Sequence, residues 1–173
     1  HASDRILKRM GRRTDREEIT ARIGRLREEI PDMAVRTTMI TGFPGETEED
    51  VEELLDFVDE MEFERLGVFP YSQEEGTPAA AMEGQIPEEE KFARRDAVME
   101  LQQEISLANG EALIGRELEV FIEGKVADEE AYVGRTYMDA PGVDGYIFVN
   151  TGLELMSGMF VRVRVTGALE YDL

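Results

Sequence analysis

Apolar residues in the first two thirds of the chain alternate between helical and strand spacing. Two stripes repeat every three or four residues and predict helices, one at Ile19, Ile23, Leu26 and Ile30 and the other at Val51, Leu54, Leu55, Val58 and Met61. Short runs bounded by turn residues follow these stripes, at residues 33–40 and 66–71, and predict strands. The order helix, strand, helix, strand is typical of parallel βα units, in a doubly wound sheet or a barrel.

Several helix starts can also be located. Thr14 and Glu17 are spaced as in a capping box, so a helix is predicted to begin there. Thr47 is predicted to cap the helix that carries the second stripe. Pro87 suits the first turn of a long helix, whose apolar positions are Val98, Leu101, Ile105, Ala108 and Ala112. Residues 72–86 form a loop before it.

The apolar spacing changes to two from Gly115 onward. Leu118, Val120 and Ile122 alternate with polar residues, and further strands are predicted at residues 131–137, 145–150 and 161–165. Several short strands in such a segment are typical of a small OB-like β-barrel. We therefore expect two domains, residues 1–113 and 114–173, with an α/β fold followed by an all-β fold.

Composition narrows the classes of function. The 173 residues carry a formal net charge of -20, which disfavours a phosphate backbone as partner and favours a basic one, although acidity can also serve solubility alone. With no cysteine and one histidine, we predict no metal site. No run approaches the roughly 18 apolar residues of a membrane span, and the chain opens without a signal-peptide pattern. We expect a cytoplasmic protein and no membrane partner.

The most informative segment is the turn from Gly42 to Thr47. Its glycines would let the backbone approach a ligand, and the next helix offers free N–H groups, although an ordinary tight βα turn would have the same composition. In the strand before it, Arg36, Thr38 and Ile40 share one face. An inward-pointing arginine requires a partner, so this face is a candidate for binding polar groups.

Three motifs resemble radical-SAM methylthiotransferases and follow one another in the order found in that family. Along the chain they are the opening His-Ala-Ser-Asp with residues 5–10, the strand and turn at residues 35–47, and Tyr-Ser with Glu-Gly-Thr-Pro-Ala at residues 71–79. The resemblance implies the carboxy-terminal half of a TIM-like radical-SAM barrel, and it continues into a β-domain similar to a TRAM domain, the substrate-docking module of the family.

The resemblance also implies a set of residues near S-adenosylmethionine. Ile40 would pack on the adenine, unless it is an ordinary core residue. Ser3 would lie near the cofactor, or it would cap the helix after it. The other implied contacts are from Arg36, Thr38, Gly42 and Gly45. No catalytic residue is implied for this chain.

Residues 134–145 resemble the RimO-type subfamily, which methylthiolates an aspartate β-carbon of small-subunit ribosomal protein S-twelve. Tyr137, Asp139 and Asp144 are candidate substrate-docking residues, although aspartates are also common in turns. The acidic charge supports this basic partner over tRNA, the substrate of the related MiaB type. Arg162 and Arg164 could face RNA, but a solvated strand face explains them equally well.

The chain departs from the family in lacking cysteine. The family uses two four-iron four-sulfur clusters, so the full-length enzyme is expected to hold both clusters and this chain neither. Alone, the chain is expected to be inactive, since the cluster supplies the electron that cleaves S-adenosylmethionine. Two alternatives stay open: a tRNA methylthiotransferase and a non-enzymatic binding module. Half a barrel leaves open strand edges, which favour a dimer.

Overall fold

The computed structural model describes residues 1–127 and 129–173, and its contacts divide the chain into two units, His1–Gln102 and Gln103–Leu173. The division falls within one long helix, so the predicted domain boundary between residues 113 and 114 stays a prediction. No helix in the described ranges is long and apolar enough to cross a membrane.

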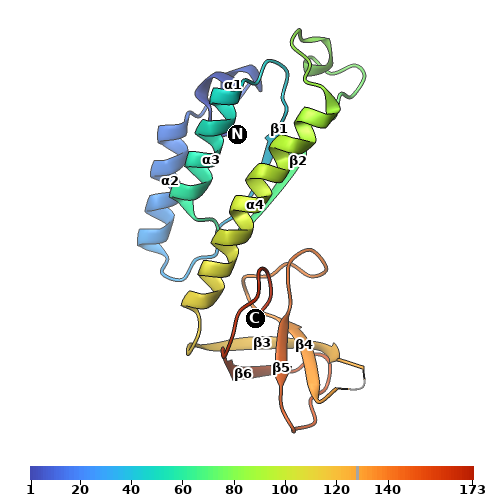
Figure 1. The fold of residues 1–173 in the computed structure, drawn as a ribbon. Coiled ribbons are helices and arrows are strands. Elements are labelled where there is room, and N and C mark those ends of the chain that lie inside the picture. Colours follow the sequence, from blue (N-terminus) through green and yellow to red (C-terminus); the bar gives the residue numbers. More distant parts are fainter. Residues whose placement is uncertain (128) are drawn as a thin grey trace. The chain divides into compact units, whose positions relative to one another are not determined.

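The first unit contains a two-stranded parallel sheet with helices packed on one of its faces (Figure 1). Strand β1 pairs with strand β2 in the register Arg36↔Arg65 to Thr41↔Pro70. The elements of the first unit are α1 (Asp4–Arg9), α2 (Arg16–Glu29), β1 (Arg36–Thr41), α3 (Glu48–Met61), β2 (Arg65–Pro70), a 3-10 turn η1 (Ala79–Ala81) and the first part of α4 (Glu88–Ala112), which ends in the second unit. Both predicted strands and their parallel pairing are present, one to three residues from the predicted bounds.

Helix α3 begins where the sequence predicts. The Thr47 hydroxyl accepts from the Asp50 N–H, and the Asp50 carboxylate accepts from the Thr47 N–H, which completes a capping box. The predicted stripe is buried except for Leu55, which is half-buried, and Phe57 is buried although the pattern did not include it. The helix ends at Glu62, which has a left-handed φ of 43°.

Helix α2 differs from the prediction in two respects. Its N-cap is Asp15, whose side chain accepts from the Glu18 N–H, so the predicted Thr14–Glu17 capping box is wrong. None of its residues is buried. The helix lies beside α3 (Figure 1), where the Arg16 side chain donates to the Glu53 carbonyl and the Arg27 side chain donates to the Met61 carbonyl. Arginine side chains thus contribute to its attachment, together with the half-buried Ile19 and Ile23.

The second unit is an antiparallel sheet with the strand order β5-β4-β3-β6. The strands are β3 (Glu117–Lys125), β4 (Ala131–Arg135), β5 (Ile147–Asn150) and β6 (Phe160–Arg164). One side of the curled sheet covers a core of Leu118, Val120, Ile122, Tyr132, Ile147, Val149 and Val165. The predicted fold class, an α/β segment followed by an all-β domain, is confirmed.

Candidate functional site

The turn between β1 and α3 is shaped by two glycines with positive φ, 72° at Gly42 and 81° at Gly45. Other residues are strained in this region of backbone space. A Cβ atom on Gly42 would collide with the Lys91 side chain, and one on Gly45 would lie 3.0 Å from the Arg9 guanidinium. Both glycines therefore let the turn pack tightly against protein. A contact of either glycine with a cofactor stays a prediction.

Glu46 lies behind this turn with a fully buried side chain. Its Oε1 accepts from the Gly42 N–H and from Arg94 Nη1, both at 2.8 Å. Its Oε2 lies 3.1 Å from His1 Nε2, and His1 Nδ1 accepts two backbone N–H groups, so Nε2 carries the proton that is donated. Burial raises the pKa of Glu46, but the hydrogen bonds from His1, Arg94 and Gly42 outweigh burial and lower it.

Arg94 connects the turn to α4. Besides Glu46, its buried guanidinium contacts Glu48 at 2.9 Å and Glu90 one turn earlier in the same helix. Burial lowers the pKa of Arg94, but the three carboxylates raise it above its ordinary value. A buried arginine held by carboxylates from the turn, from α3 and from α4 fixes these three segments together.

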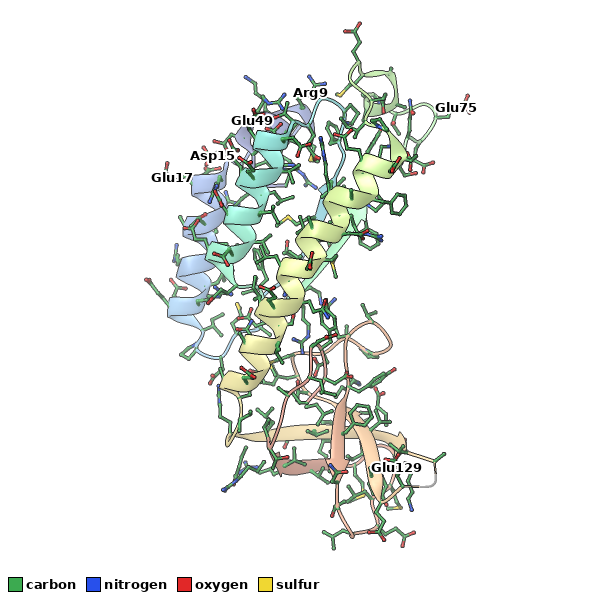
Figure 2. All side chains as sticks on the ribbon, viewed as in Figure 1. Arg9, Asp15, Glu17, Glu49, Glu75 and Glu129 are labelled. Atoms are coloured by element: carbon green, nitrogen blue, oxygen red, sulfur yellow. The ribbon has the colours of Figure 1, made fainter. Side chains whose placement is uncertain are left out.

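A second polar cluster joins α1 to the start of α3. Ser3 Oγ donates to Asp50 Oδ1 at 2.6 Å, and the Arg5 guanidinium forms an ion pair with the same carboxylate. Arg5 also donates to the Gly45 carbonyl at 2.8 Å. Burial raises the pKa of Asp50, but the hydrogen bonds from Ser3, Thr47 and Arg5 lower it to about 2. In Figure 2, Arg9 and Glu49 mark this end of the unit.

Ser3 is thus buried and fully engaged by protein. It occupies the N-cap position of α1, yet its hydroxyl makes no capping bond, so the alternative capping role is contradicted. The predicted contact between Ser3 and a cofactor stays a prediction. What the structure does show is that Ser3 donates to the Asp50 carboxylate that completes the capping box of α3.

The predicted strand face is exposed. Arg36, Thr38 and Ile40 alternate with Met39 and Thr41, which are buried; the Thr41 hydroxyl donates to the Lys91 carbonyl of α4. The open face of β1 is therefore the one turned away from α4. Arg36 lies at the far end of the strand from Gly42, roughly 20 Å along the backbone at about 3.3 Å per residue.

The structure therefore brings some predicted residues together and separates others. Ser3, Gly42 and Gly45 take part in the two polar clusters at the carboxyl end of β1, and Ile40 precedes them on the open face. Arg36 lies at the opposite end. Sequence reasoning missed Glu46 and Arg94, which organise the first of these clusters. The sequence shows Glu46 directly after Gly45, but no local pattern indicates that its partner is Arg94 of α4.

The three predicted docking residues lie in the second unit, between β4 and β5. Tyr137 is 66% exposed. Asp139 accepts from the Thr136 hydroxyl at 2.6 Å, and Asp144 accepts from the Ala140 N–H at 2.6 Å. Both carboxylates hold the turn in which they lie, as the alternative interpretation expected. Their role in docking stays a prediction.

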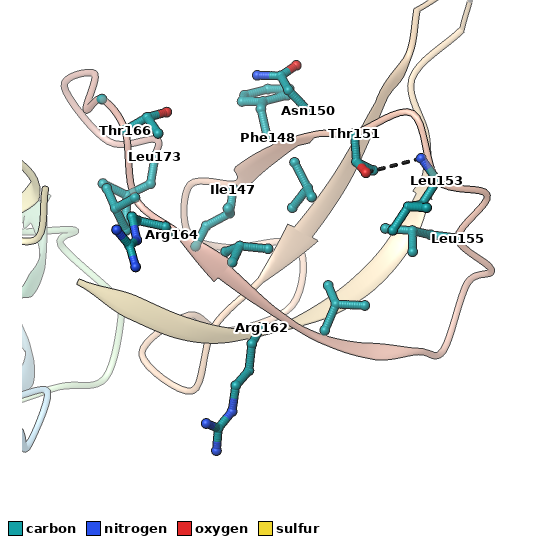
Figure 3. Close-up of a pocket in the computed structure, with 15 residues that line it drawn as sticks. Ile147, Phe148, Asn150, Thr151, Leu153, Leu155, Arg162, Arg164, Thr166 and Leu173 are labelled. Atoms are coloured by element: carbon teal, nitrogen blue, oxygen red, sulfur yellow. Dashed lines mark hydrogen bonds between the residues drawn. The ribbon is translucent and has the colours of Figure 1, made fainter. Parts of the chain in front are cut away.

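On the core side of the curled sheet, a cavity of about 390 Å³ lies between the edge strands β5 and β6 (Figure 3). Apolar side chains line most of it, among them Ile147, Leu155 and Leu173. The guanidinium of Arg162 points away from these residues (Figure 3), and Arg164 forms an ion pair with Glu117 at 3.1 Å. Both arginines are exposed residues of β6 that also border the cavity.

Comparisons with known proteins agree with these two units. Residues 1–58 match the model of the radical SAM superfamily, and residues 114–173 match that of the TRAM domain. The chain is 61% identical over 173 residues to ribosomal protein uS12 methylthiotransferase RimO of Lachnoclostridium phytofermentans. It is 52% and 51% identical to the proteins of that name from Pelotomaculum thermopropionicum and Carboxydothermus hydrogenoformans.

The chain is a homologue of the carboxy-terminal portion of RimO. The match covers 100% of the chain and 39% of the Lachnoclostridium phytofermentans protein, with similar shares for the other two. It includes the end of the radical-SAM domain and the whole TRAM match. The RimO-type resemblance predicted from the sequence is confirmed.

The chain itself offers no ligand set for an iron–sulfur cluster. It contains no cysteine, so it supplies no thiolate. Among the described residues, no group of three or more histidine and acidic side chains could hold a metal ion. Iron–sulfur clusters therefore do not fit the residues present here.

Proposed function

We propose that this chain is the carboxy-terminal part of an enzyme that adds a methylthio group to the β-carbon of an aspartate of ribosomal protein uS12. The observation that carries the proposal is the 61% identity to a RimO protein over the whole chain. In this proposal the first unit contributes to S-adenosylmethionine binding, and the TRAM unit, residues 114–173, docks the ribosomal protein.

The open face of the first unit fits the adenosine part of S-adenosylmethionine. Ile40 is an apolar residue with 37% exposure at the carboxyl end of a parallel strand, where ligands of barrel and doubly wound folds bind. Its neighbour across the sheet, Phe69, is two residues from Gly67, which has no side chain to occupy the space. We propose that Ile40 packs on the adenine and that Thr38 donates to a polar atom of the ligand.

When bound beside a reduced cluster, S-adenosylmethionine would supply the radical for hydrogen abstraction, and a second molecule would supply the methyl group. The residues of this chain bind and orient the ligand. Glu46 and Arg94 fix the turn after Ile40 against α4, so the backbone that faces the ligand is held in one conformation. Cluster ligands must come from residues outside this chain, and two four-iron four-sulfur clusters are proposed for the full-length enzyme.

Charge supports uS12 rather than tRNA as the substrate. The chain has a net charge of -20, and its TRAM segment carries eleven acidic and five basic residues. An acidic surface attracts a basic ribosomal protein and repels a phosphate backbone. A ribosomal-protein substrate also implies that the enzyme works in the cytoplasm.

The test uses the full-length protein, with its clusters reconstituted under anaerobic conditions. It is incubated with S-adenosylmethionine and purified uS12 or tRNA, and the products are analysed by mass spectrometry. The expected result is one methylthio group on an aspartate of uS12 and none on tRNA. Modification of tRNA with unmodified uS12 would show that the enzyme is of the MiaB type.

The predicted dimer through open sheet edges stays a prediction. In the described part of the first unit, β1 and β2 pair only with each other, so each strand has one edge without a strand partner. Size-exclusion chromatography with light scattering of the chain at several concentrations would show whether these edges associate.

A further inference from the structure

An exposed group of cations lies between α1 and α2. It consists of Lys8, Arg9, Arg12 and Arg13, here called the basic corner, and residues 8–13 contain no acid. None of these four side chains forms an ion pair with a residue that the structure describes. Acids outnumber lysine and arginine by 39 to 19 in this chain, so the lack of carboxylate partners is unexpected. Most other cations of the first unit do form ion pairs: Arg5, Arg16, Arg25, Arg27, Lys91, Arg94 and Arg95.

The backbone of the basic corner is fixed by the way α1 ends. The Arg12 N–H donates to the Leu7 carbonyl at 2.9 Å, and the Gly11 N–H donates to the Lys8 carbonyl at 3.0 Å. These two bonds and the positive φ of 74° at Gly11 make a Schellman motif. The chain reverses there, so the cations that follow Gly11 return beside those that precede it.

The nearest acids along the chain are engaged elsewhere. The Asp4 carboxylate accepts from the Arg16 N–H at 2.7 Å, and the Asp15 carboxylate accepts from the Glu18 N–H at 2.9 Å. Both acids therefore satisfy free N–H groups at the start of α2. Arg9 lies at one end of the first unit (Figure 2), and its charge faces no carboxylate among the described residues.

We propose that the basic corner binds the phosphate backbone of RNA. Exposed cations without carboxylate partners are the groups that neutralise phosphates, and an arginine can bind one phosphate through two N–H groups. The net charge of -20 does not prevent this contact, because exposed charges more than about 8 Å away are largely screened at physiological ionic strength.

This inference goes beyond the proposed function. In that function the acidic TRAM unit docks a basic ribosomal protein, and such a protein is bound to RNA. The basic corner would then contact the RNA beside the substrate, so that surfaces of opposite charge on one chain bind the two components of the same particle.

The test measures RNA binding by the full-length protein with reconstituted clusters. A fluorescein-labelled RNA hairpin is titrated by fluorescence anisotropy between about 50 and 200 mM KCl. The corner variant combines Lys8→Gln, Arg12→Gln and Arg13→Gln; Arg9 is kept, because its Nε donates to the Pro44 carbonyl at 3.0 Å. We expect the slope of log Kd against log salt to fall by about 0.9 for each lost contact, and the Kd at about 50 mM KCl to rise at least tenfold.

A matched control separates the corner from net charge. Arg22→Gln, Arg25→Gln and Lys125→Gln together remove the same three charges at exposed positions outside the corner. This variant should keep the wild-type Kd and slope. Equal effects of the two triple variants would assign the affinity to net charge and overturn the inference, as would wild-type protein that does not bind RNA.

The remaining outcomes also decide. Polyglutamate that displaces the hairpin as well as unlabelled RNA does would assign the corner to acidic proteins and overturn the RNA contact. Should the corner variant not fold, Lys8→Gln and Arg12→Gln are measured singly: a slope lowered by about 0.9 in each supports the contact, and unchanged slopes overturn it. If wild-type protein binds RNA through the corner but leaves uS12 unmodified, only the proposed function fails.

Discussion

Arg94 Nη1 donates to Glu46 Oε1 at 2.8 Å, and the two side chains are 7% and 0% exposed. The pair joins α4 to the turn that follows β1. Because Oε1 also accepts the Gly42 N–H, the ion pair fixes the conformation of the turn as well as its distance from the helix. We therefore expect this pair to affect both folding and the geometry of the ligand face.

Removing Arg94 should be strongly destabilising. Arg94→Met leaves Glu46 buried without its cation, and breaking a buried pair typically costs about 3–5 kcal/mol. Urea unfolding of the chain measures the loss. The matched control is Arg25→Met, whose exposed pair with Glu29 on α2 should contribute under about 0.5 kcal/mol. Equal effects of the two substitutions would contradict the role assigned to Arg94.

The Asp50 carboxylate should make the free energy of unfolding depend on pH in the acid range. Its pKa is about 2 in the folded protein, against an ordinary value of 3.8, so its contribution is fully present above pH 3.8 and is lost as the pH falls toward 2. The full contribution is on the order of 2 kcal/mol by linkage. The stability difference between wild type and Asp50→Asn should shrink across this range. A difference that does not change with pH would contradict the lowered pKa.

Replacing Glu62 with glycine should stabilise the folded protein. This residue ends α3 with a φ of 43°, a conformation that disfavours side chains. Glu62→Gly should raise the free energy of unfolding by roughly 0.5–1 kcal/mol, because glycine is the preferred residue at a left-handed helix end. Glu52→Gly, on the exposed middle of the same helix, should instead lower it by about 1 kcal/mol. Thermal unfolding of both variants checks the opposite signs.

Replacing Thr47 with serine should leave the stability of the protein nearly unchanged, whereas replacing it with alanine should lower the stability. Its hydroxyl satisfies the Asp50 N–H in the capping box, and loss of such a cap typically costs about 1 kcal/mol. Thr47→Ser keeps the hydroxyl and should retain most of the stability. Chemical denaturation of both variants tests this, and similar losses would show that the methyl group matters more than the cap.

The two predicted helix caps show what local sequence can and cannot determine. Thr47 was predicted correctly because its partner is only three residues away. At α2, Asp15 and Glu18 repeat the spacing of Thr14 and Glu17, so the sequence offered two starts. The structure uses Asp15, and the Arg16 N–H then donates to the Asp4 carboxylate, a partner twelve residues away that the local pattern does not reveal.

The candidate site shows the same limit over longer distances. The positive φ of Gly42 and Gly45 could be expected from a glycine-rich turn. Their close neighbours, Lys91 and Arg9, come from α4 and α1, and no spacing rule connects them to the turn. Likewise, strand alternation predicted that Ile40 faces away from Met39, but the exposed ring of Phe69 follows from the register between two strands.

Helix α2 has no buried residue, and charge-assisted contacts hold it: Arg16 forms an ion pair with Glu60 of α3, and Arg27 forms one with Glu64, which lies between α3 and β2. Salt screens such contacts, whereas it hardly affects the apolar core beneath α3. In native-state hydrogen exchange, raising the ionic strength should therefore speed amide exchange in α2 while α3 keeps its protection. The α2 segment would then open as a separate local unit before the rest of the chain unfolds.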